Sequence, residues 1–112
     1  MIQTQGWLPI GSVVHLRGRE GMLVLMSAMV ADSQGGQLWD YAALPYPTGR
    51  ADGEKSVLFD RDAIDCVYFV GLQDADGLRL QDMLEAQADA FEERKAERRA
   101  GAAAGVAEDV AR

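Results

Sequence analysis

His15 and Cys66 are the side chains that could serve as a general base and a nucleophile, and each residue type occurs once in the chain. A Ser-His-Asp or Cys-His mechanism would have to use His15, which stands in the apolar run Val-Val-His-Leu and is therefore expected to be structural or surface-exposed. Cys66 lies inside the apolar stretch 64–71, whereas a reactive thiol needs exposure and a nearby positive charge. We therefore predict no catalytic residue and no enzymatic activity.

Part of a calcium-binding loop is present at Asp74, Asp76 and Gly77, where alternate acids precede a glycine. When Gly77 is aligned with the sixth position of such a loop, Leu72 falls on the first ligand position and Met83 on the twelfth. Those two positions require Asp and Glu, so the loop does not match a calcium site.

Asp60, Asp62 and Asp65 form a second acidic group, which helix capping and solvation explain without a metal. Zinc requires about four Cys, His or carboxylate ligands, and one Cys with one His cannot supply the usual set. The glycine pairs of the chain lack the lysine and hydroxyl of a phosphate-binding loop. We predict neither a metal nor another cofactor.

The first candidate surface for function is aromatic. Trp39, Tyr41, Tyr46 and Pro47 lie in or beside the loop 45–49, and aromatic side chains at the centre of a patch often anchor a protein partner. An alternative interpretation, favoured for Trp39 and Tyr41, is that these two side chains belong to the core. Tyr46 is the stronger surface candidate.

The second candidate surface is the charged segment 92–99, together with Phe91 just before it. Phe91, Arg94 and Arg98 are its predicted partner-binding residues, because this segment extends beyond anything that a small sheet can cover. The alternative, which we favour, is an ordinary solvated helix end.

The elements that must position these residues are short strands followed by a helix. Strands are predicted over 12–17, 22–30, 37–44, 56–59 and 64–71, with a helical turn capped by Asp60. The run 22–26 is apolar at every position, which predicts a strand covered on both faces. Pro45 is expected to end the third strand, and 64–71 is expected to be the central strand with Val67 and Phe69 in the core.

A long helix is predicted from a cap at Asp74 or Asp76 to about residue 99. Leu80, Met83 or Leu84, Ala88 and Phe91 recur at a spacing of three to four residues, which predicts that the first half of the helix lies on the sheet. Beyond Phe91 the charges alternate without an apolar stripe, which indicates a solvated helix.

The predicted fold is thus α+β: a small bent antiparallel sheet, or partly open barrel, of about five strands, followed by one long C-terminal helix. Residues 1–100 form a single domain, and residues 101–112 are expected to be a flexible tail rich in Ala and Gly.

Charge and hydropathy narrow the class of partner. The 112-residue chain has a net charge of −7 and a pI of about 4.5, so its surface repels phosphate backbones and anionic lipids. Its first residues lack the basic and apolar regions of a secretory signal, and no apolar run reaches the roughly 18 residues of a membrane-spanning helix. We expect a cytoplasmic protein that binds no nucleic acid and does not insert into membranes.

Several motifs, taken in order, resemble one bacterial family. They are Leu-Pro-Ile-Gly-Ser-Val-Val at 8–14, Asp40-Tyr41, Pro-Tyr-Pro-Thr-Gly at 45–49, Leu58-Phe59 and Ile-Asp-Cys-Val-Tyr-Phe-Val-Gly at 64–71. Their order and spacing are similar to those of the family catalogued as domain of unknown function 4176. The resemblance covers residues 8–84 and excludes the loop 32–36 and the tail after Arg94.

Members of this family are often encoded in type VII secretion loci, near toxins and their small helical partners. The resemblance implies an adaptor or chaperone that binds a secreted toxin or its small helical partner, and it supplies no catalytic residues. An immunity protein that neutralises a co-encoded toxin is the first alternative. A small-ligand-binding domain with a pocket between sheet and helix, using His15 and Asp40, is the second.

Overall fold

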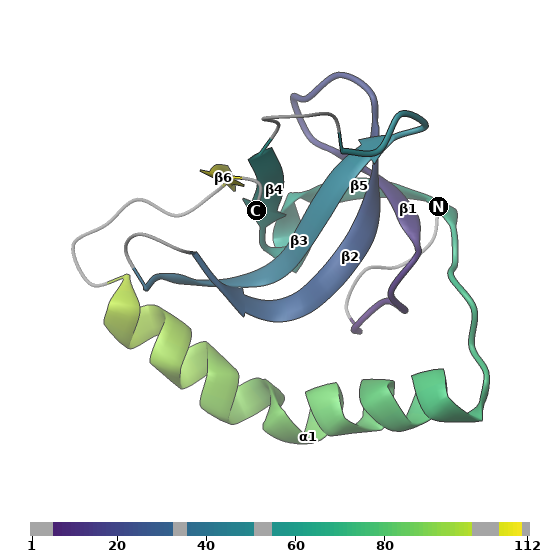
Figure 1. Ribbon diagram of the computed structural model, residues 1–112. Helices are drawn as coiled ribbons and strands as arrows, with labels where there is room; N and C mark the ends of the chain where they lie inside the picture. The colour runs from purple at the N-terminus through teal and green to yellow at the C-terminus, as the bar shows by residue number, and fades with distance from the viewer. Residues whose placement is uncertain (1–5, 33–35, 51–54, 100–105, 111–112) are drawn as a thin grey trace.

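The computed structural model describes residues 6–32, 36–50, 55–99 and 106–110 (Figure 1). Its elements are β1 Val13–Leu16, β2 Met22–Ala31, β3 Leu38–Tyr46, β4 Lys55–Phe59, a 3-10 turn Arg61–Ala63, β5 Ile64–Phe69, α1 Ala75–Arg98 and β6 Val106–Val110. The strands form one antiparallel sheet in the order β5-β1-β2-β3-β4-β6. The predicted α+β fold, an antiparallel sheet of five strands followed by a long helix, is confirmed.

A sixth strand, β6, is added to this sheet after the helix, and the sequence did not predict it. It lies within the segment for which we expected a flexible tail. Residues 101–105 and 111–112 of that segment, and 33–35 and 51–54 of the predicted loops, lie outside the described residues.

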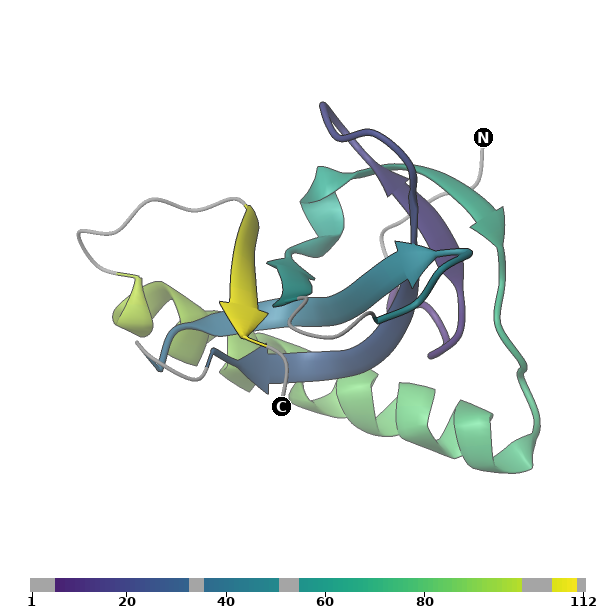
Figure 2. The same ribbon diagram turned by 45° about the horizontal axis from the view of Figure 1, so that its top comes forward.

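The sheet is strongly bent, and α1 passes along one side of it (Figure 2). β2 and β3 form a long hairpin whose register shifts between Leu25 and Ser27, so that Met26 is an extra residue in β2. Such bulges bend a strand and increase its local twist, which lets one short sheet curve around its own core.

The core lies between the inner face of this sheet and α1. Trp7 is at its centre, because its ring contacts Tyr41 edge to face at 5.5 Å and Phe91 of α1 at 6.1 Å. The buried cluster comprises Trp7, Val14, Leu16, Leu23, Leu25, Tyr41, Ala43, Val57, Phe59, Ile64, Val67, Leu84 and Phe91. The alternation of β3 is as expected, since Trp39, Tyr41 and Ala43 are all buried.

The position of β5 differs from the prediction. β5 is an edge strand and pairs with β1, so it is not the centre of the sheet. Val67 is buried as expected, but Tyr68 and Phe69 are 60% and 58% exposed. The register of β5 against β1 shifts between Val13 and Val14, and this irregularity turns Phe69 onto the outer face opposite Val13.

Pro45 does not end β3, which continues to Tyr46 and pairs Pro45 with Leu23 of β2. The pairing of β3 with β4 covers Tyr41 to Ala43, so Pro45 lies beyond that ladder. The missing N–H of proline is tolerated at such a position because one side of the strand has no β4 neighbour there.

Helix α1 begins as predicted, since the Asp74 carboxylate accepts a hydrogen bond from the Gly77 backbone N–H at 2.8 Å. Its packing differs from the prediction. Leu84, Phe91 and Lys95 are its buried residues, whereas Leu80 and Met83 in the first half are exposed. The predicted stripe is therefore confirmed at Leu84 and Phe91 and wrong at Leu80, and the charged end of α1, predicted to be solvated, is also held against the sheet through Lys95.

A buried ion cluster holds that end of α1, and it consists of Asp40, Asp60, Lys95, Arg99 and Arg61. The Lys95 ammonium lies 2.7 Å from Asp40 Oδ1 and 3.5 Å from Asp60 Oδ1, and the Arg99 guanidinium pairs with Asp60. Arg61 donates to Asp40 Oδ2 from its backbone N–H at 2.8 Å and from Nε at 3.3 Å. The predicted capping residue Asp60 therefore directs its carboxylate to this cluster.

Gly71 lies in the connection between β5 and α1, where it packs against the backbone of the segment that precedes β1. Its N–H donates to the Ser12 hydroxyl at 2.9 Å, and Ser12 is completely buried. A Cβ atom at position 71 would lie 2.5 Å from the Ile10 carbonyl oxygen and 2.9 Å from the Ser12 nitrogen. Only glycine fits here, because both neighbours are backbone atoms.

Candidate functional site

The predicted partner-binding residues fall into two groups. Trp39, Tyr41 and Phe91 are buried, so the core interpretation holds for both residues of β3. Tyr41 and Phe91 meet around Trp7, and Trp39 packs under the Arg99 guanidinium at 4.2 Å from its ring centroid.

The second group is exposed and comes from two different elements. Tyr46 and Pro47 lie at the end of β3. Arg94 and Arg98 lie on the last turns of α1, where Arg98 Nη1 donates to the Gly36 carbonyl at 2.6 Å. Of these residues, Tyr46 is the one that lines a groove.

Tyr41 is a core residue whose pKa is raised by burial. Its hydroxyl oxygen accepts a hydrogen bond from the Leu8 N–H at 2.7 Å, and its side chain is completely buried. Burial disfavours the charged phenolate and raises the pKa of Tyr41 to about 12.

This pKa predicts a loss of stability at high pH. The folded protein holds the Tyr41 proton more tightly than the unfolded chain, whose tyrosine pKa is about 10, so the stabilisation is present below pH 10 and is lost as pH rises toward 12. We expect the free energy of unfolding to fall by roughly 2 to 3 kcal/mol over this range through Tyr41 alone. Urea denaturation at several pH values measures it.

Tyr41→Phe is the control for this titration, because it keeps the ring and removes the ionising group. Lys95 contributes in the same range: burial opposes its charge, but hydrogen bonds from its ammonium to Asp40 and Glu92 outweigh burial and raise its pKa. Lys95 is present in both the native protein and Tyr41→Phe. The difference between the two proteins in how the free energy of unfolding changes with pH is therefore due to Tyr41. If the free energy of unfolding fell with pH at the same rate in both proteins above pH 10, the raised pKa of Tyr41 would be contradicted.

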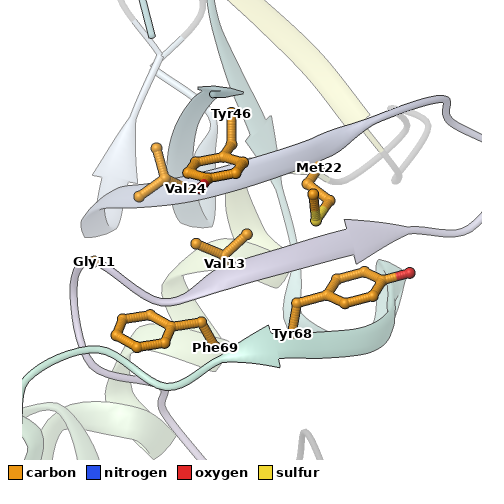
Figure 3. Close-up of a pocket in the computed structure, with 7 residues that line it drawn as sticks. All are labelled: Gly11, Val13, Met22, Val24, Tyr46, Tyr68 and Phe69. Atoms are coloured by element: carbon orange, nitrogen blue, oxygen red, sulfur yellow. The ribbon is translucent and has the colours of Figure 1, made fainter. Parts of the chain in front are cut away.

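The outer face of the sheet carries an apolar groove with a volume of about 560 Å³ (Figure 3). Its lining residues come from β3, β2, β1 and β5 and from the turn before β1: Tyr46, Met22, Val24, Val13, Tyr68, Phe69 and Gly11. We refer to it as the outer groove.

The strand register explains why these side chains meet. Leu23 and Leu25 of β2 face the core, so Met22 and Val24 face outward. Met22 stands opposite Tyr46 on β3, and Val24 stands opposite Val13 on β1. Val13 in turn stands opposite Phe69 on β5. Pairs directly opposite each other share a face of the sheet, so a continuous apolar row crosses four strands.

The chemistry of the outer groove is that of a binding surface. Its side chains are aliphatic or aromatic, with the Tyr46 and Tyr68 hydroxyls as its polar side-chain groups. Tyr46, Tyr68 and Phe69 are each about half exposed or more, and large aromatic side chains gathered in this way mark interaction sites. The arrangement suits apolar side chains of another molecule.

The sequence predicts Tyr46 as a partner-binding residue, but it does not predict the other residues that line the outer groove. The run 22–26 carries a signal for this surface because it is apolar at every position, but the prediction that both faces of this strand are covered is wrong. The structure shows that the outer face is not covered there, since Met26 is 50% exposed. A strand with two apolar faces can also signal one face in the core and one available to a partner.

The histidine and acidic residues considered for chemistry have structural partners. His15 Nδ1 lies 2.7 Å from Asp65 Oδ1, and Asp40 belongs to the buried ion cluster. In the part of the chain that the structure describes, His, Cys, Asp and Glu residues form no group that could hold a metal ion. Among the same described residues, no helix is both long and apolar enough to cross a membrane.

The fold and the outer groove define a small α+β domain with one apolar sheet face turned to solvent. The model of the family described as domain of unknown function (DUF4176) matches residues 7–80, and the chain belongs to that family. The match runs from Trp7 through all of β1 to β5 into the first turns of α1. No curated protein and no solved structure matches the chain.

The pair Asp40-Tyr41, one of the motifs on which the sequence resemblance rests, has a structural role in this chain. Asp40 binds Lys95 and Arg61, and Tyr41 holds the backbone of Leu8. The motif thus joins β3 to the helix on one side and to the N-terminal segment on the other.

Proposed function

We propose that this protein is a non-enzymatic accessory protein that acts in the cytoplasm as an adaptor or chaperone for a type VII secretion substrate. The outer groove is the observation that supports binding of a protein partner. Membership of the family supports the connection with secretion, through the genomic setting that the family resemblance implies. The partner in this proposal is a secreted toxin or its small helical partner.

The physical argument starts from the exposed aromatic side chains. Apolar area removed from water contributes about 25 cal/mol per Å², and partly exposed aromatic rings are the residues that contribute most when a partner covers them. A substrate kept competent for export needs its own apolar segments shielded until it leaves, and the outer groove provides a complementary apolar surface for such a segment.

Co-purification with the products of the neighbouring genes tests the proposal, and one double substitution tests the site. Tyr68→Ser with Phe69→Ser removes both exposed aromatic residues of β5, and we expect the affinity for the partner to fall at least about tenfold. Isothermal titration with the co-purified partner measures the change.

Leu72→Ser with Met83→Ser is the matched control, because both side chains are exposed and apolar but lie outside the groove lining. We expect this control to bind as the native protein does, and both variants to keep the native melting temperature. Failure to recover any neighbouring product would contradict the proposed function. Equal affinity of the two variants would contradict the site.

The alternatives predict different behaviour of the same groove. An immunity protein would protect cells from a co-encoded toxin, whereas an adaptor supports export without protection, so a toxicity assay separates these two. A small-ligand site typically encloses about 300 to 1,000 Å³ and buries most of its ligand. The volume of the outer groove falls in this range, but the groove is open and lies on the outer face rather than between sheet and helix.

A further inference from the structure

The outer edge of β4 is occupied by a segment of the same chain that comes from far along the sequence. β6 pairs with all of β4, from Lys55 opposite Val110 to Phe59 opposite Val106. Figures 1 and 2 show this last strand beside β4, after the chain has left α1. The last strand of the sheet therefore follows α1 in the chain, whereas the other five strands precede it.

β4 is fixed in position by its packing and by its pairing with β3, so a further strand can pair with its other edge. Val57, Leu58 and Phe59 are buried, and β3 pairs with β4 on its inner edge. Without a strand on the other edge, β4 would present a row of backbone donors and acceptors that are ready to pair.

The strand that occupies this edge has a sequence with weak strand preference. It reads Val-Ala-Glu-Asp-Val, and alanine, glutamate and aspartate are all depleted in strands. It follows the sequence Ala-Gly-Ala-Ala-Ala-Gly at 100–105, which has no large apolar side chain. The family match ends at residue 80, so this strand also lies outside the matched part of the chain.

The described side chains at one end of β4 are basic, and the sequence of β6 contains two acids, Glu108 and Asp109. Lys55 opens β4, and Arg50 Nη2 donates to the Ser56 hydroxyl at 3.0 Å. These two basic side chains lie at the start of β4, and Ser56 is paired with position 109 of β6 in the register of the two strands. An acidic extended segment is thus matched to this edge by charge as well as by backbone pairing.

From these observations we infer that the outer edge of β4 is a strand-acceptor site for an extended acidic segment of a protein partner, and that β6 is its resident, displaceable occupant. Binding adds a strand by backbone hydrogen bonds, and the cations near Lys55 favour acidic residues in the incoming segment. β6 keeps the edge paired in the absence of a partner, and it competes with one because it is tethered to the same chain. This site is independent of the outer groove.

The test uses the full chain with β6 disabled and a labelled peptide of residues 104–112 as the probe. Ala107→Pro with Glu108→Pro removes two successive backbone N–H groups, one of which must point toward β4. We expect the peptide to bind this variant at least tenfold more tightly than the native chain, measured by fluorescence anisotropy. Ala102→Pro with Ala103→Pro is the matched control and should bind the peptide as weakly as the native chain.

Three further measurements make the outcome decisive. A peptide with lysine in place of both acids should bind the disabled variant at least tenfold more weakly, and raising the salt concentration should weaken the acidic peptide. Tyr68→Ser with Phe69→Ser, introduced into the disabled variant, should leave peptide binding unchanged, which separates this site from the proposed function. Equal binding by the native and disabled chains would overturn the inference. A native chain that dimerises through β6 as its concentration rises would overturn the assignment to a separate partner.

Discussion

Asp40→Ala is expected to lower the free energy of unfolding by about 3 to 5 kcal/mol, because it leaves the Lys95 ammonium in a buried site without its nearest carboxylate. The same substitution removes the acceptor of the Arg61 backbone N–H and of Arg61 Nε. Asp60 remains 3.5 Å from Lys95, and Glu92 remains 3.1 Å away at the surface, so the loss is large but not that of an isolated charge. Urea denaturation at neutral pH measures it.

Asp76→Ala is the matched control, since Asp76 also forms an ion pair, with Arg79 at 3.2 Å, but its side chain is 86% exposed. Exposed pairs contribute about 0 to 1 kcal/mol, so the control should be nearly neutral. Asp40→Ala combined with Lys95→Met should be less destabilised than the sum of the two single variants, because no unpaired charge remains. Equal effects of Asp40→Ala and Asp76→Ala would show that the ion cluster does not hold α1.

Gly71→Ala has the second large expected effect, a loss of about 2 to 4 kcal/mol from backbone displacement and a weakened hydrogen bond to Ser12. The new Cβ atom would meet the Ile10 carbonyl oxygen at 2.5 Å, and neither backbone can rotate away as a side chain could. Because about 1 kcal/mol corresponds to several degrees in a domain of this size, the melting temperature should fall by roughly 10 °C or more. Differential scanning calorimetry measures it.

Gly6→Ala is the corresponding control, since its nearest contact would be the Glu85 carboxylate at 3.7 Å, an ordinary separation. We expect its melting temperature to lie within a few degrees of the native value. A native melting temperature for Gly71→Ala would mean that the connection between β5 and α1 is not constrained as the structure shows.

The sequence predicts the positions of the first five strands, the long helix and its Asp74 cap, because each rests on a local pattern. Alternation on β3 places Trp39 and Tyr41 in the core, and the turn residues separate the strands. These signals depend on neighbouring residues in the chain, so they need no knowledge of how the elements pack.

The packing of α1 could not be predicted from such patterns. Lys95 continues the buried stripe of Leu84 and Phe91 at helical spacing, but a lysine counts as polar in any pattern of hydropathy. Its burial depends on Asp40 and Asp60, which are 55 and 35 residues away. Pairing between such distant charges is a property of the folded chain.

The outer groove was only partly predictable for a related reason. The apolar residues of β2 were visible, and so were Tyr68 and Phe69, but covered and exposed apolar faces have the same composition. Because β5 is an edge strand, its outer apolar face is exposed rather than covered. The order of strands in a sheet cannot be predicted from the pattern of any single segment. β6 escaped prediction because its composition resembles that of a solvated tail.

The order of the strands has a consequence for avidity. The outer groove spans β5 to β3, and a strand bound on the outer edge of β4 lies two strand positions beyond β3, about 10 Å away at the usual strand spacing. A partner that carries an apolar segment and an acidic strand, joined by a few residues, would therefore engage both on one molecule. Its second contact would form at an effective concentration on the order of millimolar, so two individually weak contacts would hold it firmly until either one is released.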